Sequence, residues 1–234
     1  MLRKAYFRAI QSNEAPENYL IDMDFPSQAV RGALWRLGTC FLRSFKWRFF
    51  LKKVHNLMFV GRNVQIYTPS MLSIGKNFMA EDGVEIVAHS KDGVIFGDNV
   101  KIGAYTLIRP SSIFGWEMGE GIVVGNNVLI GPHNFIGFGG KIEIGDYVMT
   151  APHVCIVSTN HSYDDIEVPL RQQPFKNQTI IIENNVWIST NVTILPGVRI
   201  GKGSIVGAGS LVNRDVEQYS IVAGVPAHPI KSRK

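Results

Sequence analysis

The sequence predicts an all-β protein built from short strands that stack as triangular coils. Three observations lead to this expectation. Units of six residues follow one another through most of the chain, nearly all of them beginning with Ile or Val. The second position is often Gly, and small residues there let the chain turn. A period of six fits neither the two-residue alternation of a flat strand nor the 3.6-residue turn of a helix.

Three such units close one coil, and each coil buries its aliphatic side chains against the coils above and below. The units VGNNVL, IGPHNF and IGFGGK run consecutively from Val124, and IGDYVM, TAPHVC and IVSTNH run consecutively from Ile144. They resume at Ile182 as IENNVW, ISTNVT, ILPGVR, IGKGSI, VGAGSL and VNRDVE, and earlier copies fill 96–113. A glycine-rich β-sandwich, the alternative all-β architecture, would not keep this register.

The phase of the repeat also predicts which side chains stack. His133 and His153 occupy the same position in adjacent coils. We therefore expect them one above the other, about 4.8 Å apart, as neighbouring strands are. Tyr105 on one side and Asn191 on the other take the same position, so a polar ladder is predicted along one edge.

Two segments interrupt the repeat. Residues 114–123 form a short excursion, and residues 162–181, polar and charged, form a long one. A long loop that leaves a rigid scaffold is often functional. His161 stands at the junction, as the last residue of IVSTNH, which we interpret as the third side of its coil.

Ahead of the repeat, residues 29–54 are predicted as a helix rich in basic and aromatic residues. One face carries Leu34, Leu37, Phe41 and Phe45. Residues 25–80 contain Lys and Arg but no Asp or Glu. Three interpretations stay open for the helix: a cap on the open end of the stack, peripheral contact with an anionic membrane surface, or binding of a partner.

Composition sets further bounds. At 234 residues, with 45% hydrophobic and 18% charged residues, the chain can form one sizeable ordered core. The net charge of +5 is concentrated in the region 25–80, so no nucleic acid partner is expected. Cys40 and Cys155, without a pairing pattern or secretory signal, predict a cytoplasmic protein. The predicted organisation is an N-terminal segment 1–55, a β-helix domain 56–217 and a tail 218–234.

Over roughly residues 60–217 the repeat resembles the left-handed parallel β-helix of the hexapeptide-repeat acyltransferases. The segments STNHSYDDIEVPLRQQ, NNVWIST, IVGAGSLVNRD and AGVPAHPIK are most similar to the maltose/galactoside and polysaccharide O-acetyltransferases of that family. The resemblance implies a homotrimer with acetyl-CoA and a saccharide acceptor between subunits. It also implies that His161, which follows the coil before the loop, is the general base.

The chemistry agrees with this assignment. Acetyl transfer from a thioester to a hydroxyl needs a base near neutral pKa, and histidine meets that need without a metal or a covalent intermediate. Asp164 or Asp165 is a candidate to orient the imidazole, as is a backbone carbonyl. Cys155 is interpreted as a small packed residue and not as an acyl carrier.

The same resemblance implies the other site residues. Acetyl-CoA contacts are expected from Thr190, Ala208, Asn213, Arg214 and Lys231, with the two cations on the CoA phosphates. This chain departs from the family at Asn213, where a hydroxyl residue is common, and at Arg214, where Lys is common. Acceptor contacts are expected from His133, Asn134, Asp164 and Trp187, with packing near the base as the other interpretation of Trp187.

The sequence thus favours an O-acetyltransferase of polysaccharide biosynthesis, acting on a polysaccharide, a lipid-linked glycan or a sugar precursor. The basic helix would suit work at the inner face of the membrane. Acetylation of an amino sugar by the same base is the alternative reaction. A carbonic-anhydrase-like zinc site of His133, His153 and His161, and a non-catalytic scaffold, are the alternatives of another class.

Overall fold

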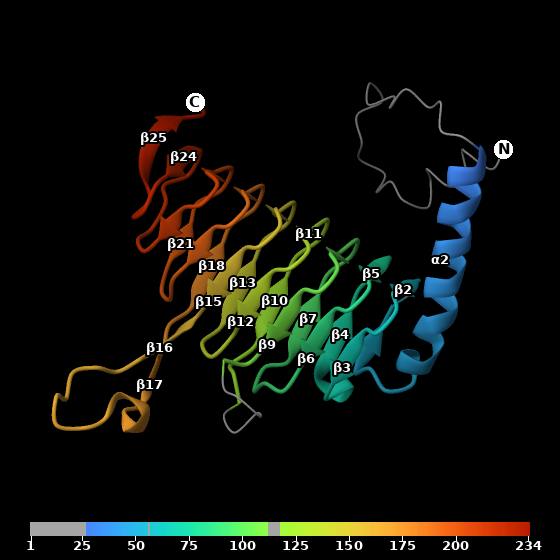
Figure 1. Cartoon of the computed structure of the whole chain (residues 1–234), viewed down its shortest axis with the longest axis horizontal. Coiled ribbons are helices and arrows are strands. Elements are labelled where there is room, and N and C mark those ends of the chain that lie inside the picture. The colour runs from blue at the N-terminus through green and yellow to red at the C-terminus, as the bar shows by residue number, and fades with distance from the viewer. Residues whose placement is uncertain (1–26, 56, 112–117) are drawn as a thin grey trace.

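The computed structural model describes residues 27–55, 57–111 and 118–234. In this part of the chain, successive strands go in rotation to three parallel sheets, so that three strands make one coil. Figure 1 shows the coils stacked in chain order, with the helix α2 (Ser27–Arg48) at one end and the chain's C-terminus at the other.

The sheets are named A, B and C. Sheet A contains β1 (Lys53–Val54), β4 (Leu72–Ile74), β7 (Val94–Phe96), β10 (Ile122–Val124), β13 (Ile142–Ile144), β18 (Ile180–Ile182) and β21 (Arg199–Ile200). Sheet B contains β2 (Met58–Val60), β5 (Phe78–Ala80), β8 (Lys101–Ile102), β11 (Leu129–Ile130), β14 (Met149–Thr150), β19 (Trp187–Ile188), β22 (Ile205–Val206), β24 (Ser220–Ala223) and β25 (His228–Ser232). Sheet C contains β3 (Gln65–Tyr67), β6 (Glu85–Val87), β9 (Leu107–Arg109), β12 (Phe135–Gly137), β15 (Cys155–Val157), β20 (Thr193–Ile194) and β23 (Leu211–Val212).

The core consists of aliphatic side chains stacked from coil to coil. Ile136, Ile156 and Ile194 are register partners on consecutive strands of sheet C, and all three are fully buried. Burying each such side chain contributes about 1.5–3 kcal/mol. The small second position has a steric reason, because a Cβ on Gly131 would lie 2.6 Å from backbone atoms of Ala151 on the next coil.

The turns between sheets B and C, here called the B–C corner, carry the predicted ladder. His133 and His153 both have a left-handed backbone, with φ of 56° and 60°. Their rings stack with centroids 5.0 Å apart, and Tyr105 stacks on His133 at 5.4 Å. Asn191 continues the corner, its backbone N–H donating to the carbonyl of Pro152. The stacking predicted from the phase of the repeat is confirmed.

Helix α2 is shorter than the predicted helix over 29–54, and its end was predicted wrongly. It stops at Arg48, and Lys53–Val54 already pair with Ser73–Ile74 as the first strand of sheet A. Extended pairing removes these residues from the helix. The β-helix therefore starts before residue 56.

One face of α2 caps the stack, which confirms that interpretation. The helix contacts β2, Ser44 is fully buried, and Trp47 packs against the core. No helix within residues 27–55, 57–111 and 118–234 is long and apolar enough to cross a membrane.

The C-terminal residues differ from the predicted tail. Ile221 and Val222 pair in parallel with Ile205 and Val206, so β24 extends sheet B by one more strand. Strand β25 then turns back antiparallel to β24. The backbone groups of β22 and β24 are thereby paired, and β25 becomes the edge strand of sheet B.

The long interruption forms an arm that leaves the stack (Figure 1). Strands β16 (Thr159–His161) and β17 (Phe175–Asn177) pair antiparallel, and a short 3-10 helix, Leu170–Gln172, lies between them. The third side of this coil ends at Val157, so only the first part of IVSTNH is a coil side. The prediction for the rest of this unit was wrong because Thr159–His161 find an antiparallel partner outside the stack.

Candidate active site

His161 is exposed on β16, at the point where the arm leaves the stack. Antiparallel pairing places it opposite Phe175 of β17, and the two ring centroids are 4.4 Å apart. The backbone N–H of His161 donates to Oδ1 of Asn160 at 2.9 Å. The strand pairing therefore holds the backbone of His161 in place, and the imidazole has an apolar neighbour on one side.

The carboxylates of the arm do not orient this histidine. Asp164 forms an ion pair with Nζ of Lys176 at 2.7 Å, and this hydrogen bond raises the pKa of Lys176. Asp165 accepts a hydrogen bond from the backbone N–H of Glu167 at 3.0 Å. Among the described residues, neither carboxylate is bonded to His161, so Asp164 is a residue that ties the two sides of the arm together.

Gln173 organises the arm, and the sequence pattern did not point to it. Its amide is buried and donates to the carbonyls of Asp165 and Val168, at 2.7 and 2.9 Å. A buried glutamine that satisfies two loop carbonyls holds the arm in one shape. The only sequence signal was a polar residue before Pro174 inside a long loop, which is too common to single it out.

The two candidate acceptor residues at the B–C corner differ in their surroundings. His133 is exposed on the ladder, as an acceptor contact must be. Asn134 is only 1% exposed and lies inside the stack. Its Nδ2 donates to Thr150 Oγ1 at 2.5 Å, and its Oδ1 accepts from the N–H of Val154 at 2.8 Å. Asn134 is therefore a structural residue, which corrects its prediction as an acceptor contact.

The candidate CoA residues fall into three places. Thr190 and Ala208 lie on adjacent coils of the B–C corner, where Gly209 N–H donates to the carbonyl of Thr190 at 2.9 Å. Asn213 and Arg214 are exposed after β23, at the opposite edge of sheet C. Lys231 is exposed on β25. The structure thus groups the first pair with the histidine ladder, and the second pair with the corner from which the arm leaves.

Trp187 lies on the outer face of sheet B, 46% exposed. It lines a groove of about 440 Å³ together with Leu129 and Met149. His161 lies beyond the far edge of sheet C, so within one chain Trp187 does not pack near the predicted base.

The three histidines of the zinc alternative do not converge. The rings of His133 and His153 are parallel to within 10°, and His161 lies beyond the other edge of sheet C. Among the described residues, no three His, Cys, Asp or Glu side chains are grouped as metal ligands. At Cys155, burial raises the pKa of the thiol, which disfavours the thiolate that an acyl carrier needs.

Three parallel sheets in a six-residue register, with an arm that presents one histidine, define a β-helix protein of the hexapeptide-repeat class. A family model described as "Bacterial transferase hexapeptide (six repeats)" matches residues 179–214. These residues carry the hexapeptide repeat of bacterial transferases, and the stack has the fold of the left-handed parallel β-helix. The predicted fold is confirmed, and the matched repeat supports the predicted resemblance to the hexapeptide-repeat acyltransferases.

Two curated relatives are similar over much of the chain. A probable acetyltransferase of Mycobacterium tuberculosis is 33% identical over 180 residues, which cover 76% of this chain and 55% of the relative. The chain therefore spans about half the length of that protein. The dTDP-4-amino-4,6-dideoxy-D-glucose acyltransferase of Escherichia coli is 27% identical over 176 residues, or 73% of this chain and 86% of the relative.

One solved structure has the same fold. A variant of AntD, an N-acyltransferase from Bacillus cereus in complex with dTDP-4-amino-4,6-dideoxyglucose and coenzyme A, matches with a TM-score of 0.54. The sequences are 22% identical, and the match covers 82% of this chain and 89% of that chain.

Proposed function

We propose that this protein is an acetyl-CoA-dependent O-acetyltransferase with a saccharide acceptor and His161 as general base. The observation that carries the proposal is the position of His161. It is exposed, it is fixed by the pairing of β16 with β17, and it belongs to a hexapeptide-repeat acyltransferase scaffold. A solvent-accessible imidazole at a fixed place can accept a proton from an incoming hydroxyl.

The reaction uses the two substrates, this base and a hydrogen-bond donor, such as a backbone N–H, for the tetrahedral oxyanion. His161 takes the proton of the acceptor hydroxyl as its oxygen attacks the thioester carbonyl. The tetrahedral intermediate then releases the CoA thiolate, and the imidazolium returns the proton to it. Holding both substrates in one ternary complex supplies much of the remaining rate.

The geometry of one chain favours a site shared between subunits. His161 and His133 lie at opposite edges of sheet C, so one chain does not bring base and acceptor ladder together. We propose a homotrimer in which the arm of one subunit reaches the B–C corner of the next. The exposed apolar side chains of sheet B, Leu129, Met149 and Trp187, are suited to a contact between subunits.

Acetyl-CoA is proposed to lie along the coils nearest the C-terminus. Thr190 and Ala208 of one subunit would line the pantetheine groove, and Asn213 and Arg214, which lie at the opposite edge of sheet C, would meet the polar end of the cofactor from the neighbouring subunit. Lys231 is also exposed and is a further candidate for this end. A structural neighbour was solved with bound coenzyme A, which supports this choice of co-substrate.

Acetylation of an amine is the second candidate, because the Escherichia coli relative is named for an amino sugar nucleotide. The test is a thiol-release assay with acetyl-CoA and paired acceptors that differ only by hydroxyl or amine at one position. Turnover with the hydroxyl member supports O-acetylation, and turnover restricted to the amine overturns it. Absence of acetyl-CoA binding by calorimetry would instead favour a non-catalytic scaffold.

We also propose a cytoplasmic location at the inner face of the membrane. The face of α2 that points away from the stack exposes large apolar side chains, including Trp35 at 78%, and Phe49, directly after the helix, is 83% exposed. Leu42 and Phe45 lie between them and are also exposed. Basic residues flank this stripe, and α2 contains no acidic residue. A basic helix with exposed aromatic residues is suited to an anionic lipid surface.

A further inference from the structure

A cavity of about 640 Å³ lies between α2 and the first coils, at the foot of the B–C corner. Its volume is within the range of small-molecule sites. Arg43, Lys46 and Trp47 line it from the helix, and Arg62, Asp82 and Tyr105 line it from the coils. The cavity is distinct from the arm that carries His161.

Positive charge exceeds negative charge in this cavity. Its three cations face one carboxylate, Asp82, which is already occupied by Arg62. The backbone N–H of Arg62 donates to Oδ1 at 2.8 Å, and its guanidinium pairs with Oδ2 at 2.9 Å. These hydrogen bonds hold the pKa of Asp82 below its usual value, led by the one from the backbone. Asp82 is therefore ionised and paired with Arg62.

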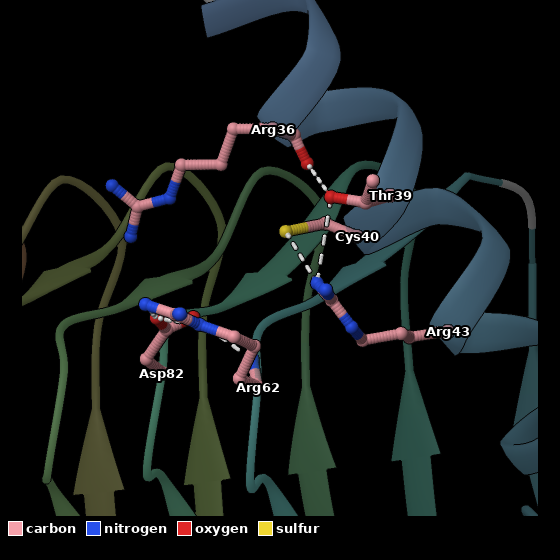
Figure 2. Close-up of polar contacts among 6 residues, drawn as sticks. All are labelled: Arg36, Thr39, Cys40, Arg43, Arg62 and Asp82. Atoms are coloured by element: carbon pink, nitrogen blue, oxygen red, sulfur yellow. Dashed lines mark hydrogen bonds and ion pairs between the residues drawn. The ribbon is translucent and has the colours of Figure 1, made fainter. Parts of the chain in front are cut away.

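The two cations from α2 lack such a partner. Figure 2 shows Arg43 turned toward Thr39 and Cys40 on its own helix, at long distances of 3.5 and 3.9 Å. Lys46 lies over the Trp47 ring, 4.8 Å from its centroid. Within the described residues, neither forms an ion pair. Both charges are available to a bound anion.

The charged side chains of the cavity suit an oxyanion. Arg43 and Lys46 form no ion pair among the described residues, and the one carboxylate, Asp82, is held by Arg62. Arginine binds phosphate oxygens through paired N–H groups, and lysine binds them as a point charge.

The cavity is continuous with the histidine ladder. Tyr105 lines it and also stacks on His133, which stacks on His153. These three residues occupy consecutive coils, spaced by about 4.8 Å. A ligand with its anionic end in the cavity would extend along this ladder toward the level of the arm.

We infer that the cavity binds the phosphates of a diphosphate-linked saccharide, and that the sugar of this acceptor lies along the ladder. The inference rests on the proposed function for the role of the sugar. The diphosphate could belong to a nucleotide sugar or to a lipid-linked sugar, since both present the same oxygens to Arg43, Lys46 and Arg62.

The test is calorimetry on the full chain, without acetyl-CoA, using inorganic pyrophosphate, UDP and farnesyl diphosphate. The cavity variant is the double change Arg43→Gln and Lys46→Gln. The matched control is Arg31→Gln with Lys76→Gln, which removes the same charge from exposed residues that do not line the cavity. We expect the cavity variant to lose at least tenfold in affinity for pyrophosphate, and the control to stay within twofold of the natural sequence.

The outcomes separate cleanly. Equal losses in both variants would reduce the effect to net charge and overturn the inference, as would absence of binding to the natural sequence. Thermal unfolding and acetyl-CoA binding of both variants report on folding. Tighter binding of UDP than of farnesyl diphosphate indicates a nucleotide sugar, and the reverse indicates a lipid-linked one; either supports the site.

The proposed function can fail separately from this inference. Diphosphate binding that follows the expected pattern, without acetyl transfer to any acceptor, would leave the site standing and reject the enzyme assignment. Acetyl transfer to neutral sugars with kcat/KM unchanged in the cavity variant, and no diphosphate binding, would support the enzyme assignment and reject the diphosphate site.

Discussion

The imidazole of His161 and the ring of Phe175 face each other across the two strands of the arm, with their planes inclined at 52°. No carboxylate among the described residues forms a hydrogen bond with the imidazole. The ring contact with Phe175 and the strand pairing therefore set the orientation of the imidazole. Phe175 is thus a positioning residue for the proposed base. The proposed catalytic role of His161 on β16 therefore depends on the pairing of β16 with β17.

Replacing His161 tests the proposed base. His161→Ala is expected to lower acetyl transfer by about 10²–10⁴-fold, the usual contribution of general base catalysis. Acetyl-CoA affinity and oligomeric state should stay unchanged, because the side chain is exposed. His55→Ala, another exposed histidine, is the matched control and should retain full activity. A loss below about tenfold in His161→Ala would reject the residue as the essential base.

Replacing Phe175 tests the positioning role. Phe175→Ala should lower kcat by about tenfold, since a small misplacement of a catalytic group costs one or two orders of magnitude. KM for acetyl-CoA should not change, because Phe175 is not among the expected CoA contacts. Phe175→Tyr keeps the ring and should restore most of kcat. A variant that loses activity and thermal stability in parallel, without rescue by Tyr, would point to a folding role only.

Substitutions at Asn134 and at its neighbour His133 should have different effects, the first on stability and the second on acceptor binding. Asn134→Ala leaves the buried N–H of Val154 without its acceptor and removes one of the two hydrogen bonds that Thr150 Oγ1 accepts, so the free energy of unfolding should fall by about 1–3 kcal/mol. His133→Asn keeps a residue that tolerates the left-handed backbone, and its stability should change by no more than about 0.5 kcal/mol. Denaturant unfolding measures both. The acceptor KM should rise only for His133→Asn, and the reverse pattern would return Asn134 to the site.

The stability of the stack should depend on acid pH through Asp82 and Glu183. The backbone N–H of Arg62 lowers the pKa of Asp82, and that of Lys202 lowers the pKa of Glu183. A lowered folded-state pKa means that the stabilisation is complete above the unfolded values of 3.8 and 4.5, and disappears as pH falls below them. Urea midpoints between pH 7 and pH 3 should therefore drop less steeply for Asp82→Asn with Glu183→Gln than for the natural sequence. Identical slopes would contradict this account.

Vesicle binding tests the exposed face of α2. The full chain should sediment with vesicles that contain anionic phosphatidylserine, and high salt should release it. Serine at Trp35, Leu42 and Phe49 should abolish this binding. Serine at Ile166, Leu170 and Ile230, three exposed apolar residues away from α2, is the matched control and should leave it unchanged. If the natural sequence does not bind, or if both variants bind equally, the stripe has another occupant, such as residues 1–26 or a second copy of the chain.

The histidine ladder shows how far the sequence carries the site. Its four members share one position of the repeat, and a repeat held in phase fixes their vertical order along the stack. The inward turn of Asn134 follows the same rule, because it stands where other units have a buried Val. It was missed because asparagine is usually exposed, and only the network with Thr150 makes its burial favourable.

By itself, the sequence determined the stacked coils, the ladder and the position of the arm in the chain. A large aliphatic residue at every sixth position, with small residues beside it that let the chain turn, predicts short strands that bury these side chains in stacked coils. Only the tertiary structure decided that His161 leaves the stack, that one face of α2 caps it while the other stays exposed, and that Arg43 and Arg62 meet around one cavity. These features depend on which strand or helix face finds a partner distant in sequence, and a local period carries no information about such pairing.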